Sequence, residues 1–311
     1  MIGIIVKRLI QGVPTVFGVT LITFILFNVV GGDPVTHYLG KSANPKEVEL
    51  MKKEYGLDQP LINQYTDFLE EIVTFDFGRS YRTRDPVSEM LLDRIGPSLS
   101  LTLPALVLTT LLGIAIALLS TYNRGRTIDR SLVVLAVAGM SVSFLVYIIV
   151  GQYFLAFEFQ LFEIHGYRDG SLSRWQYLAL PILILTTVGL GYDSQYYRAV
   201  MLEERQNDYI LTAQAKGLND HRIMFRHILS NALIPIISRI MISVPFLVTG
   251  SLLLESFFGI PGTGSLLLES LMSGDLPVIK AFTVMVSLLF IFSNILTDLL
   301  YIWADPRVRP S

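Results

Sequence analysis

The chain has 311 residues, of which 52% are hydrophobic and only 16% are charged, and its mean hydropathy is +0.54. An ordinary soluble domain carries about 25% charged residues, so this composition is typical of a membrane protein. The formal net charge of -2 argues against a nucleic-acid partner, because neutralising phosphates requires a basic surface. The absence of cysteine excludes disulfides, thiolate metal sites and cysteine nucleophiles.

The first apolar run covers residues 9–30 and is preceded by Lys7 and Arg8, as a secretory signal peptide would be. Its 22 residues are long enough, as a helix, to cross a hydrocarbon core of about 30 Å. No cleavage site of small residues follows it. We therefore expect a retained membrane-spanning helix.

Five further apolar runs, with approximate ends, predict a total of six spans, which places both termini on the same side of the membrane. They cover residues 99–122, 132–157, 177–192, 232–254 and 278–303. On one side the short connections carry only Arg168 and Arg174, whereas the other side carries twelve basic residues: Lys7, Arg8, Arg124, Arg126, Arg130, Arg198, Arg205, Lys216, Arg222, Arg226, Arg307 and Arg309. The positive-inside rule makes the side with twelve cytoplasmic.

The connection between the first two spans, residues 31–98, is too long for its charges to determine its side, so we expect a large external loop. Within it, Asn44 as an N-cap and Pro45 at the first helical position predict a helix that ends near Gly56. The stripe formed by Val87, Leu91 and Arg94 predicts an interfacial helix that leads into the second span. The alternative is an external cap that only stabilises the bundle.

Two patterns that could hold a ligand fail on inspection. The sequence LGKS at residues 39–42 resembles the end of a phosphate-binding loop, but Val35 stands where that loop requires its first glycine. His221 and His227 are six residues apart and lack the helical spacing on which metal sites are built. We expect no catalytic residue, no metal and no cofactor.

Three charged residues lie within predicted spans, where each costs several kcal/mol at mid-membrane. Lys280 and Asp298 lie toward opposite ends of the last span and are expected to reach the interface. Arg239 lies deeper and is a candidate to line a water-filled path. The spans show no chain of acidic residues of the kind that proton-driven transporters use.

The most informative polar stretch is DYILTAQAKGLNDHRIMFRHILSNALIP, which starts at residue 208 between two apolar runs. Residues 208–216 favour a helix, and Gly217 can adopt the left-handed conformation that ends one. Asn219 is a suitable cap for a second helix with a partly apolar face. The small residues Ala213 and Ala215 allow another surface to approach the backbone closely. Together these features predict a docking site for a cytoplasmic partner.

Several motifs in this order resemble one known family. They are KRLIQGVPTVFGVTLITFIL and GDP at the first span, YGLDQPLINQY and FDFGRSYRTRDPV in the outer loop, DYILTAQAKGL and RHILSNALIP, ESFFGIPGTG, and DLLYIWADPRVR. The chain resembles the inner-membrane permease subunits of ATP-binding-cassette importers, specifically the first permease of the dipeptide, oligopeptide and nickel group. The outer segment FEFQLFEIHGYRDGS, residues 157–171, matches no part of that pattern.

The resemblance implies an all-α, type I importer permease fold with six transmembrane helices. It divides the chain into a cytoplasmic N-terminus with the first span (1–30), the external loop (31–98), a permease core (96–303) that contains a coupling loop (198–231), and a cytoplasmic tail (304–311). In that family a helix of the coupling loop lies in a groove of the cytoplasmic ATPase. The residues that it assigns to this contact are Tyr209, Thr212, Ala213, Ala215, Lys216, Gly217 and Leu218.

On the outer face, the proline and glycines of ESFFGIPGTGSLLLES predict a turn that folds back on the bundle. We expect this turn and the external loop to form a rim that receives an external substrate-binding protein. The rim residues are Phe258, Pro261, Gly262 and Gly264, with Phe257 beside them.

The resemblance further implies a non-catalytic subunit of the bacterial inner membrane, with both termini cytoplasmic. Its partners would be a second homologous permease, two cytoplasmic ATPases and the binding protein, and alternating access would be driven by ATP. The expected substrate is a short peptide, with nickel or another small solute as the alternative. An ATP-independent secondary transporter or channel, and a membrane scaffold without transport, are the rival functions, but the inverted repeats typical of secondary transporters are not visible.

Overall fold

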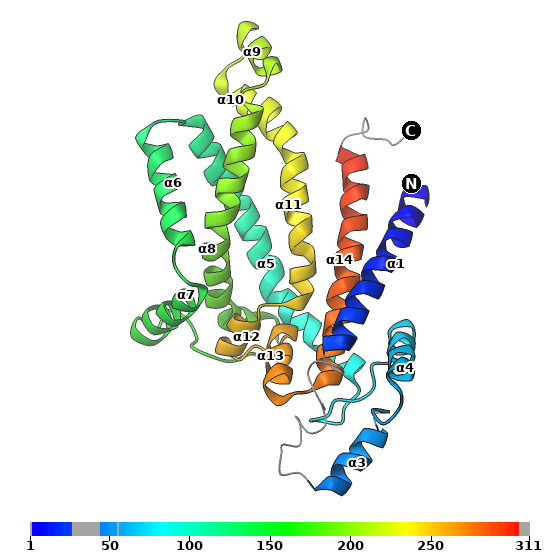
Figure 1. The fold of residues 1–311 in the computed structure, drawn as a ribbon. Helices are drawn as coiled ribbons and strands as arrows, with labels where there is room; N and C mark the ends of the chain where they lie inside the picture. The colour runs from blue at the N-terminus through cyan, green and yellow to red at the C-terminus, as the bar shows by residue number, and fades with distance from the viewer. Residues whose placement is uncertain (1, 27–43, 55, 169, 305–311) are drawn as a thin grey trace. The chain divides into compact units, whose positions relative to one another are not determined.

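The computed structural model describes residues 2–26, 44–54, 56–168 and 170–304. Within these ranges the secondary structure is helical, apart from an isolated β-bridge between Arg79 and Pro86. The helices divide between two compact units, and α5, α11 and α14 contribute residues to both of them. Figure 1 follows the helices by colour along the chain. The phosphate-loop-like sequence at 39–42 and the tail from residue 305 lie outside the described residues.

The first unit comprises residues 1–98, 248–256 and 261–295. Its core joins apolar side chains from five helices and includes Phe24, Phe68, Leu91, Leu266 and Phe282. The helices that contribute to this unit are α1 (Ile2–Phe24), α3 (Pro45–Glu54), α4 (Leu61–Thr74), the start of α5 (Val87–Tyr122), α12 (Leu252–Phe258), α13 (Thr263–Ser273) and most of α14 (Leu276–Ala304).

The second unit comprises residues 99–247, 257–260 and 296–311. In it α6 packs closely against α8, because Gly191 leaves room for the backbone of α6: a Cβ added there would lie 2.8 Å from Cγ of Met140. Besides the rest of α5, its helices are α6 (Thr127–Met140), α7 (Phe144–Val150), the π-helix η2 (Gly151–Glu158), α8 (Ser171–Glu204), α9 (Asp208–Ala215), α10 (Asp220–Ile223), the π-helix η3 (Met224–Leu229) and α11 (Ser230–Thr249).

Among the described residues, four helices are long and apolar enough to cross a membrane. They are Val87–Tyr122, Arg174–Glu204, Asp220–Thr249 and Leu276–Leu300. A bent pair of helices, Thr127–Met140 and Phe144–Glu158, makes a fifth if it is counted as one span. The described part of the first predicted span holds a shorter apolar helix, Ile10–Phe24, and the remainder of that span lies outside the described residues. The chain is therefore a multi-pass membrane protein.

The predicted span 132–157 differs from a continuous helix, because α6 and the α7–η2 pair are bent by 92°. The break follows Met140: Ser141 Oγ donates to the carbonyl of Val137 at 2.8 Å, and Ser143 takes an extended conformation before α7. Tyr147 then donates its hydroxyl to the carbonyl of Gly139 at 3.0 Å, which fastens α7 back onto the end of α6. Hydropathy alone is uniform across this break and cannot reveal it.

The helix predictions for the connection between the first two predicted spans are partly confirmed. The helix α3 begins at Pro45, the side chain of Asn44 accepts a hydrogen bond from the backbone of Lys46 at 3.1 Å, and Gly56 has a φ of 64°. The helix predicted to lead into the second span is present as the start of α5, which begins at Val87 and continues unbroken to Tyr122, but its apolar stripe does not lie at an interface. Val87 and Leu91 are buried in the core of the first unit, so this stripe faces protein.

Candidate functional site

A helical elbow follows the end of α8, and we define it as residues 208–229, containing α9, α10 and η3. Figure 1 shows α9 and α10 beyond the ends of α8 and α11. Gly217 separates α9 from α10 with a φ of 77°, in the left-handed region that a β-carbon disfavours. Asn219 accepts a hydrogen bond from the backbone of Arg222 at 3.0 Å and so caps α10. The predicted pair of helices that meet at a glycine is confirmed.

The elbow has an inner face that belongs to the core of the second unit. Ile210, Ile223 and Ile228 are buried there. They pack in one cluster with Tyr197 and Met201 of α8. This burial fixes the elbow to the long helices α8 and α11.

The predicted contact residues divide between the two faces. Tyr209, Thr212, Ala215, Lys216 and Gly217 are exposed. Ala213 is buried in the cluster and Leu218 packs against it. The side chain of Ala213 is therefore not available to a partner, whereas Leu218 is only partly buried and its contact with a partner stays a prediction.

A polar link also ties the elbow to the adjoining helices. Tyr209 donates its hydroxyl to the carboxylate of Glu204 at the end of α8, and Asn231 of α11 donates to the same hydroxyl at 3.0 Å. Burial and the bond to Glu204 raise the pKa of the Tyr209 hydroxyl. On the other arm, the ring of His221 stacks on Tyr122 with centroids 5.1 Å apart. Sequence reasoning missed Glu204, Asn231 and Tyr122, since contacts between helices leave no local pattern.

An ion pair joins α5, α6 and α8 near the elbow. Asp129 receives two hydrogen bonds from Arg198, at 2.9 and 3.0 Å, and one from the hydroxyl of Ser120 at 2.5 Å. The backbone N–H of Gly125 adds a fourth at 2.9 Å. The side chain of Asp129 is only 5% exposed and that of Arg198 is 22% exposed, so this pair is largely removed from water. Arg205 extends the polar contacts by donating to the carbonyl of Thr121 at 2.7 Å.

Arg239 on α11 has an acidic partner that the sequence analysis overlooked. Its Nε lies 3.1 Å from Oδ1 of Asp193 on α8, and its guanidinium lies 5.8 Å from the ring centroid of Tyr196. The arginine side chain remains 38% exposed. The charge of Arg239 is thus balanced within the protein by Asp193. That Arg239 lines a path stays a prediction, and Asp193 would be a necessary part of that path.

The turn that links α11 to α13 is organised around Glu255, which is fully buried. Its carboxylate accepts hydrogen bonds from the hydroxyl of Ser98 at 2.8 Å and from the backbone N–H groups of Ser251 and Ser265 at 3.1 and 3.0 Å. Burial raises the pKa of this carboxyl, while the hydrogen bonds oppose the rise. A Cβ added at Gly262 would lie 2.3 Å from Oε2 of Glu255, so only glycine fits.

This geometry corrects the predicted rim. Phe258, Gly262 and Gly264 are buried, and Pro261 is partly buried, so these residues shape the turn and do not offer a surface. The exposed large apolar side chain of this stretch is Phe257, and Leu271 and Met272 directly after it are also exposed. Glutamate 255 was not singled out from the sequence, although a carboxylate among serines and glycines in an apolar stretch is the signal that marks it.

Among the described residues no cluster of three or more potential ligands could hold a metal ion. The charged groups of the Asp129–Arg198, Asp193–Arg239 and Glu255 networks bind one another, a hydroxyl group or the backbone.

Comparison with known proteins gives this geometry its context. The family described as "Binding-protein-dependent transport system inner membrane component" matches residues 90–310, and the corresponding N-terminal family matches residues 1–102. A putative peptide transport system permease protein of Brucella abortus (strain 2308) is 34% identical over 312 residues, which is 99% of each chain. A glutathione transport system permease protein of Escherichia coli (strain K12) is 32% identical over 310 residues, again 99% of each chain. The chain therefore belongs to the family of binding-protein-dependent transport system inner membrane components, the permease subunits of ATP-binding-cassette importers.

Proposed function

We propose that this permease imports short peptides, and that its elbow carries the force of ATP hydrolysis from cytoplasmic ATPase subunits to the spanning helices. The substrate class rests on the relatives, which are named for peptides and for the tripeptide glutathione. In this proposal the chain itself performs no covalent chemistry. A second homologous permease, two ATPases and an external binding protein complete the importer.

The topology we propose has six spans in the bacterial inner membrane, with both termini and the elbow in the cytoplasm. It rests on the basic side chains of the short connections, which include Arg124, Arg126, Arg222 and Arg226 on the same side as the elbow. The segment between the first and second spans is then external. The first span would include residues that lie outside the described part of the chain.

The observation that carries the coupling proposal is the two-faced construction of the elbow. Its inner face is fixed to α8 and α11 by the buried cluster and by the Tyr209 contacts. Its outer face leaves Thr212, Ala215 and Lys216 exposed, with Leu211 61% exposed beside them. A connection that only joined two spans would need neither an anchored inner face nor an exposed apolar residue. A lever that docks in a groove of a partner needs both.

Alternating access follows from this construction by a shift between two states. A partner can shift a conformational equilibrium only by its differential affinity for the two states. ATP binding that closes the ATPases would favour the arrangement of α8 and α11 that opens the path outward, and hydrolysis would reset it. Hinged helices with rigid packing between them respond as units, which suits this mechanism.

The coupling proposal is tested at Gly217. A β-branched residue is disfavoured at a φ of 77°, so Gly217→Val should strain the elbow by about 1 to 2 kcal/mol and add bulk to its outer face. Apart from its two neighbours in the chain, no heavy atom of the described residues lies within 4 Å of a Cβ added there, so the fold can accept the side chain. We expect normal membrane insertion but a sharp loss of ATPase-subunit retention and of peptide-stimulated hydrolysis, with Gly217→Ala milder.

The matched control is Gly78→Val, because Gly78 has a φ of 70° and equally open surroundings but lies in the segment proposed to be external. It should carry the same backbone strain without loss of coupling. A Gly217→Val importer that couples hydrolysis to uptake at the wild-type rate would refute the docking role of the elbow. Uptake of labelled di- and tripeptides by proteoliposomes containing the whole importer tests the substrate class, with nickel uptake as the competing result.

A further inference from the structure

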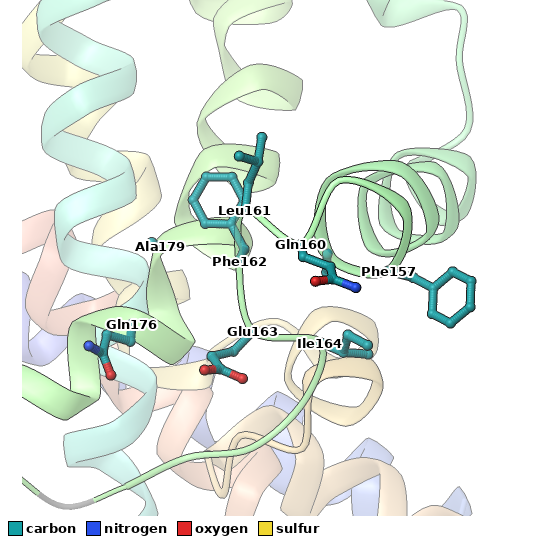
Figure 2. A pocket seen from close by; sticks show the side chains of 9 residues that line it. Phe157, Gln160, Leu161, Phe162, Glu163, Ile164, Gln176 and Ala179 are labelled. Carbon is teal, nitrogen blue, oxygen red and sulfur yellow. The ribbon is translucent and has the colours of Figure 1, made fainter.

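Residues 156–157 and 160–164, most of them in the segment for which sequence analysis found no motif, line a pocket of about 830 Å³ in the second unit (Figure 2). The pocket lies where η2 ends and α8 begins, and Gln176 and Ala179 of α8 complete it. Small-molecule sites usually enclose about 300 to 1,000 Å³, so the pocket is large enough for a peptide of a few residues. Its lining residues are Ala156, Phe157, Gln160, Leu161, Phe162, Glu163, Ile164, Gln176 and Ala179.

The loop that forms this wall is held in place at two points. Gln152 donates its side-chain amide to the carbonyl of Ile164 at 3.3 Å and to that of Phe257 at 3.1 Å. Two residues farther on, the N–H of Gly166 donates to the carbonyl of Phe258 at 2.8 Å. The backbone at Gln160 has a φ of 52°, which a residue other than glycine adopts only when its surroundings impose it. The pocket is thus a built feature of this chain.

The polar side chains of the pocket are available to a ligand. Glu163 is the one ionisable residue in the lining, and its carboxylate takes part in no hydrogen bond or ion pair with the described residues. The side-chain amides of Gln160 and Gln176 are likewise without an internal partner in that part of the chain. A cavity with an unpaired carboxylate, and with no lysine or arginine in its lining, favours a ligand that carries a positive charge.

The pocket is also divided along its length. Figure 2 shows the side chains of Leu161 and Phe162 toward one end, and those of Glu163 and Gln176 toward the other. A ligand that fits this division has an apolar group at a short distance from a cation and from hydrogen-bonding amides. The N-terminal residue of a peptide has this chemistry, since its α-ammonium, its first peptide group and its side chain radiate from one carbon.

We propose that this pocket receives the N-terminal residue of the transported peptide. Glu163 pairs with the α-ammonium, Gln176 on the same side of the pocket bonds the first peptide group, and Leu161 and Phe162 hold an apolar first side chain. This inference rests on the proposed import of peptides and adds a selective site within the permease. The permease then prefers peptides with a free amino terminus and an apolar first residue, independently of the choice made by the binding protein.

The test uses the purified whole importer in proteoliposomes and two probes, Phe-Ala-Ala and its N-acetylated form. With wild-type protein, the KM for uptake of the free peptide should be lower. Glu163→Gln should raise that KM about fivefold, as expected when one charged partner is removed at an exposed site, and should leave the KM of the acetylated peptide unchanged. Glu158→Gln is the matched control, because Glu158 is an exposed carboxylate of the same stretch outside the lining.

A second measurement separates this site from the binding protein. Photocrosslinking of a benzophenone-labelled Phe-Ala-Ala to the importer without the binding protein should label residues 157–179 in wild type, and Glu163→Gln should weaken it. Equal loss of uptake for both probes, together with weaker capture of the binding protein, would show a protein-docking role instead and would overturn the inference. Peptide uptake that Glu163→Gln does not alter would overturn the inference and leave the proposed function standing, whereas absence of any peptide uptake would overturn both.

Discussion

Glu71 and Lys280 show how single charges are accommodated at the edge of the first unit. Both line a cavity of about 400 Å³, and the Lys280 ammonium lies 5.9 and 5.5 Å from the ring centroids of Phe24 and Phe68. Burial raises the pKa of Glu71 to about 7; the positive charge of Lys280 opposes that rise and the nearby Asp67 adds to it. The aromatic rings supply part of the stabilisation that water would otherwise give the ammonium.

The raised pKa of Glu71 predicts a particular pH dependence of stability. The folded protein binds this proton more tightly than the unfolded chain, so the resulting stabilisation is fully present below pH 4.5 and is lost as the pH rises through about 7. Glu71→Gln stays neutral at every pH. At pH 8 its free energy of unfolding should therefore exceed that of wild type by an amount on the order of 1 kcal/mol after allowance for solvent access, and it should melt at a higher temperature. The two proteins should approach each other toward pH 5.

Thermal melts of the detergent-solubilised protein between pH 5 and pH 8.5 measure this difference. Glu70→Gln removes an exposed carboxylate next in the chain and should leave the wild-type profile unchanged. If Glu71→Gln followed the wild-type curve at every pH, the burial of the Glu71 carboxyl would be contradicted.

The sequence was sufficient to identify residues whose role depends on the local backbone conformation. It was not sufficient to identify residues whose role depends on a partner far away in the chain. Gly217 and Asn219 were found because a left-handed turn and a helix cap have local signatures. Asp193 was missed because its partner Arg239 is 46 residues away, and Glu255 was missed although two of its partners, Ser251 and Ser265, are near it in the chain and only Ser98 is 157 residues away. Pairing over such distances depends on how helices pack, and one sequence carries no direct record of that.

At the scale of elements, the same limit explains the elbow. The order of its two helices and the glycine between them were predictable, but the direction of Ala213 was not. Eight residues of α9 give barely two turns, and its mixed composition defines no clear apolar stripe. Only contact with the ends of α8 and α11 determines which side of so short a helix is buried. The bend between α6 and α7 was missed for a related reason, since the hydroxyl of Ser141 is bonded to the backbone within an otherwise apolar run.

The Asp129–Arg198 pair is the main polar connection between elements near the elbow, and it predicts a strong mutational effect. Asp129→Ala leaves the largely buried guanidinium of Arg198 without its partner and should destabilise the protein by about 3 kcal/mol. Removing both charges in the Asp129→Ala, Arg198→Ala double variant should cost less than the sum of the single changes, because no unpaired charge remains.

Apparent melting temperatures of the two single variants and the double variant give the coupling energy. Asp220→Ala is a suitable control, because Asp220 is exposed and begins α10 without an ion pair in the described residues. It should lower stability by no more than about 0.5 kcal/mol. Strict additivity of the two single changes would mean that the pair does not hold α6 to α8.

At the scale of the whole molecule, the chain passes repeatedly between its two units. Residues 99–247 form most of the second unit, after which residues 248–256 and 261–295 return to the first. Composition was enough to predict a helical membrane protein, and motif order was enough to predict its family. The division into units was not predictable, because three long helices, α5, α11 and α14, each contribute residues to both units.

The number and orientation of the spans give the prediction at this scale. With six spans and cytoplasmic termini, Arg124 and Lys216 should face the cytoplasm, whereas Lys52 and Arg168 should face outward, as the distribution of basic residues requires. The chain contains no cysteine, so a single cysteine can be placed at each position without removing any other. Arg124, Lys216 and Arg168 are exposed, so their replacement should not disturb the fold.

Labelling with a membrane-impermeant maleimide in intact spheroplasts separates the two sets of positions. Cysteine at 168 or 52 should react at once, and cysteine at 216 or 124 should react only after the membrane is opened. Five spans would place the two termini on opposite sides, so cysteines added after Met1 and at Ser311 extend the test to the ends. If the cysteine at 216 reacted from outside while that at 168 was protected, the elbow would lie on the wrong side of the membrane for an ATPase, and the coupling proposal would fail together with the topology.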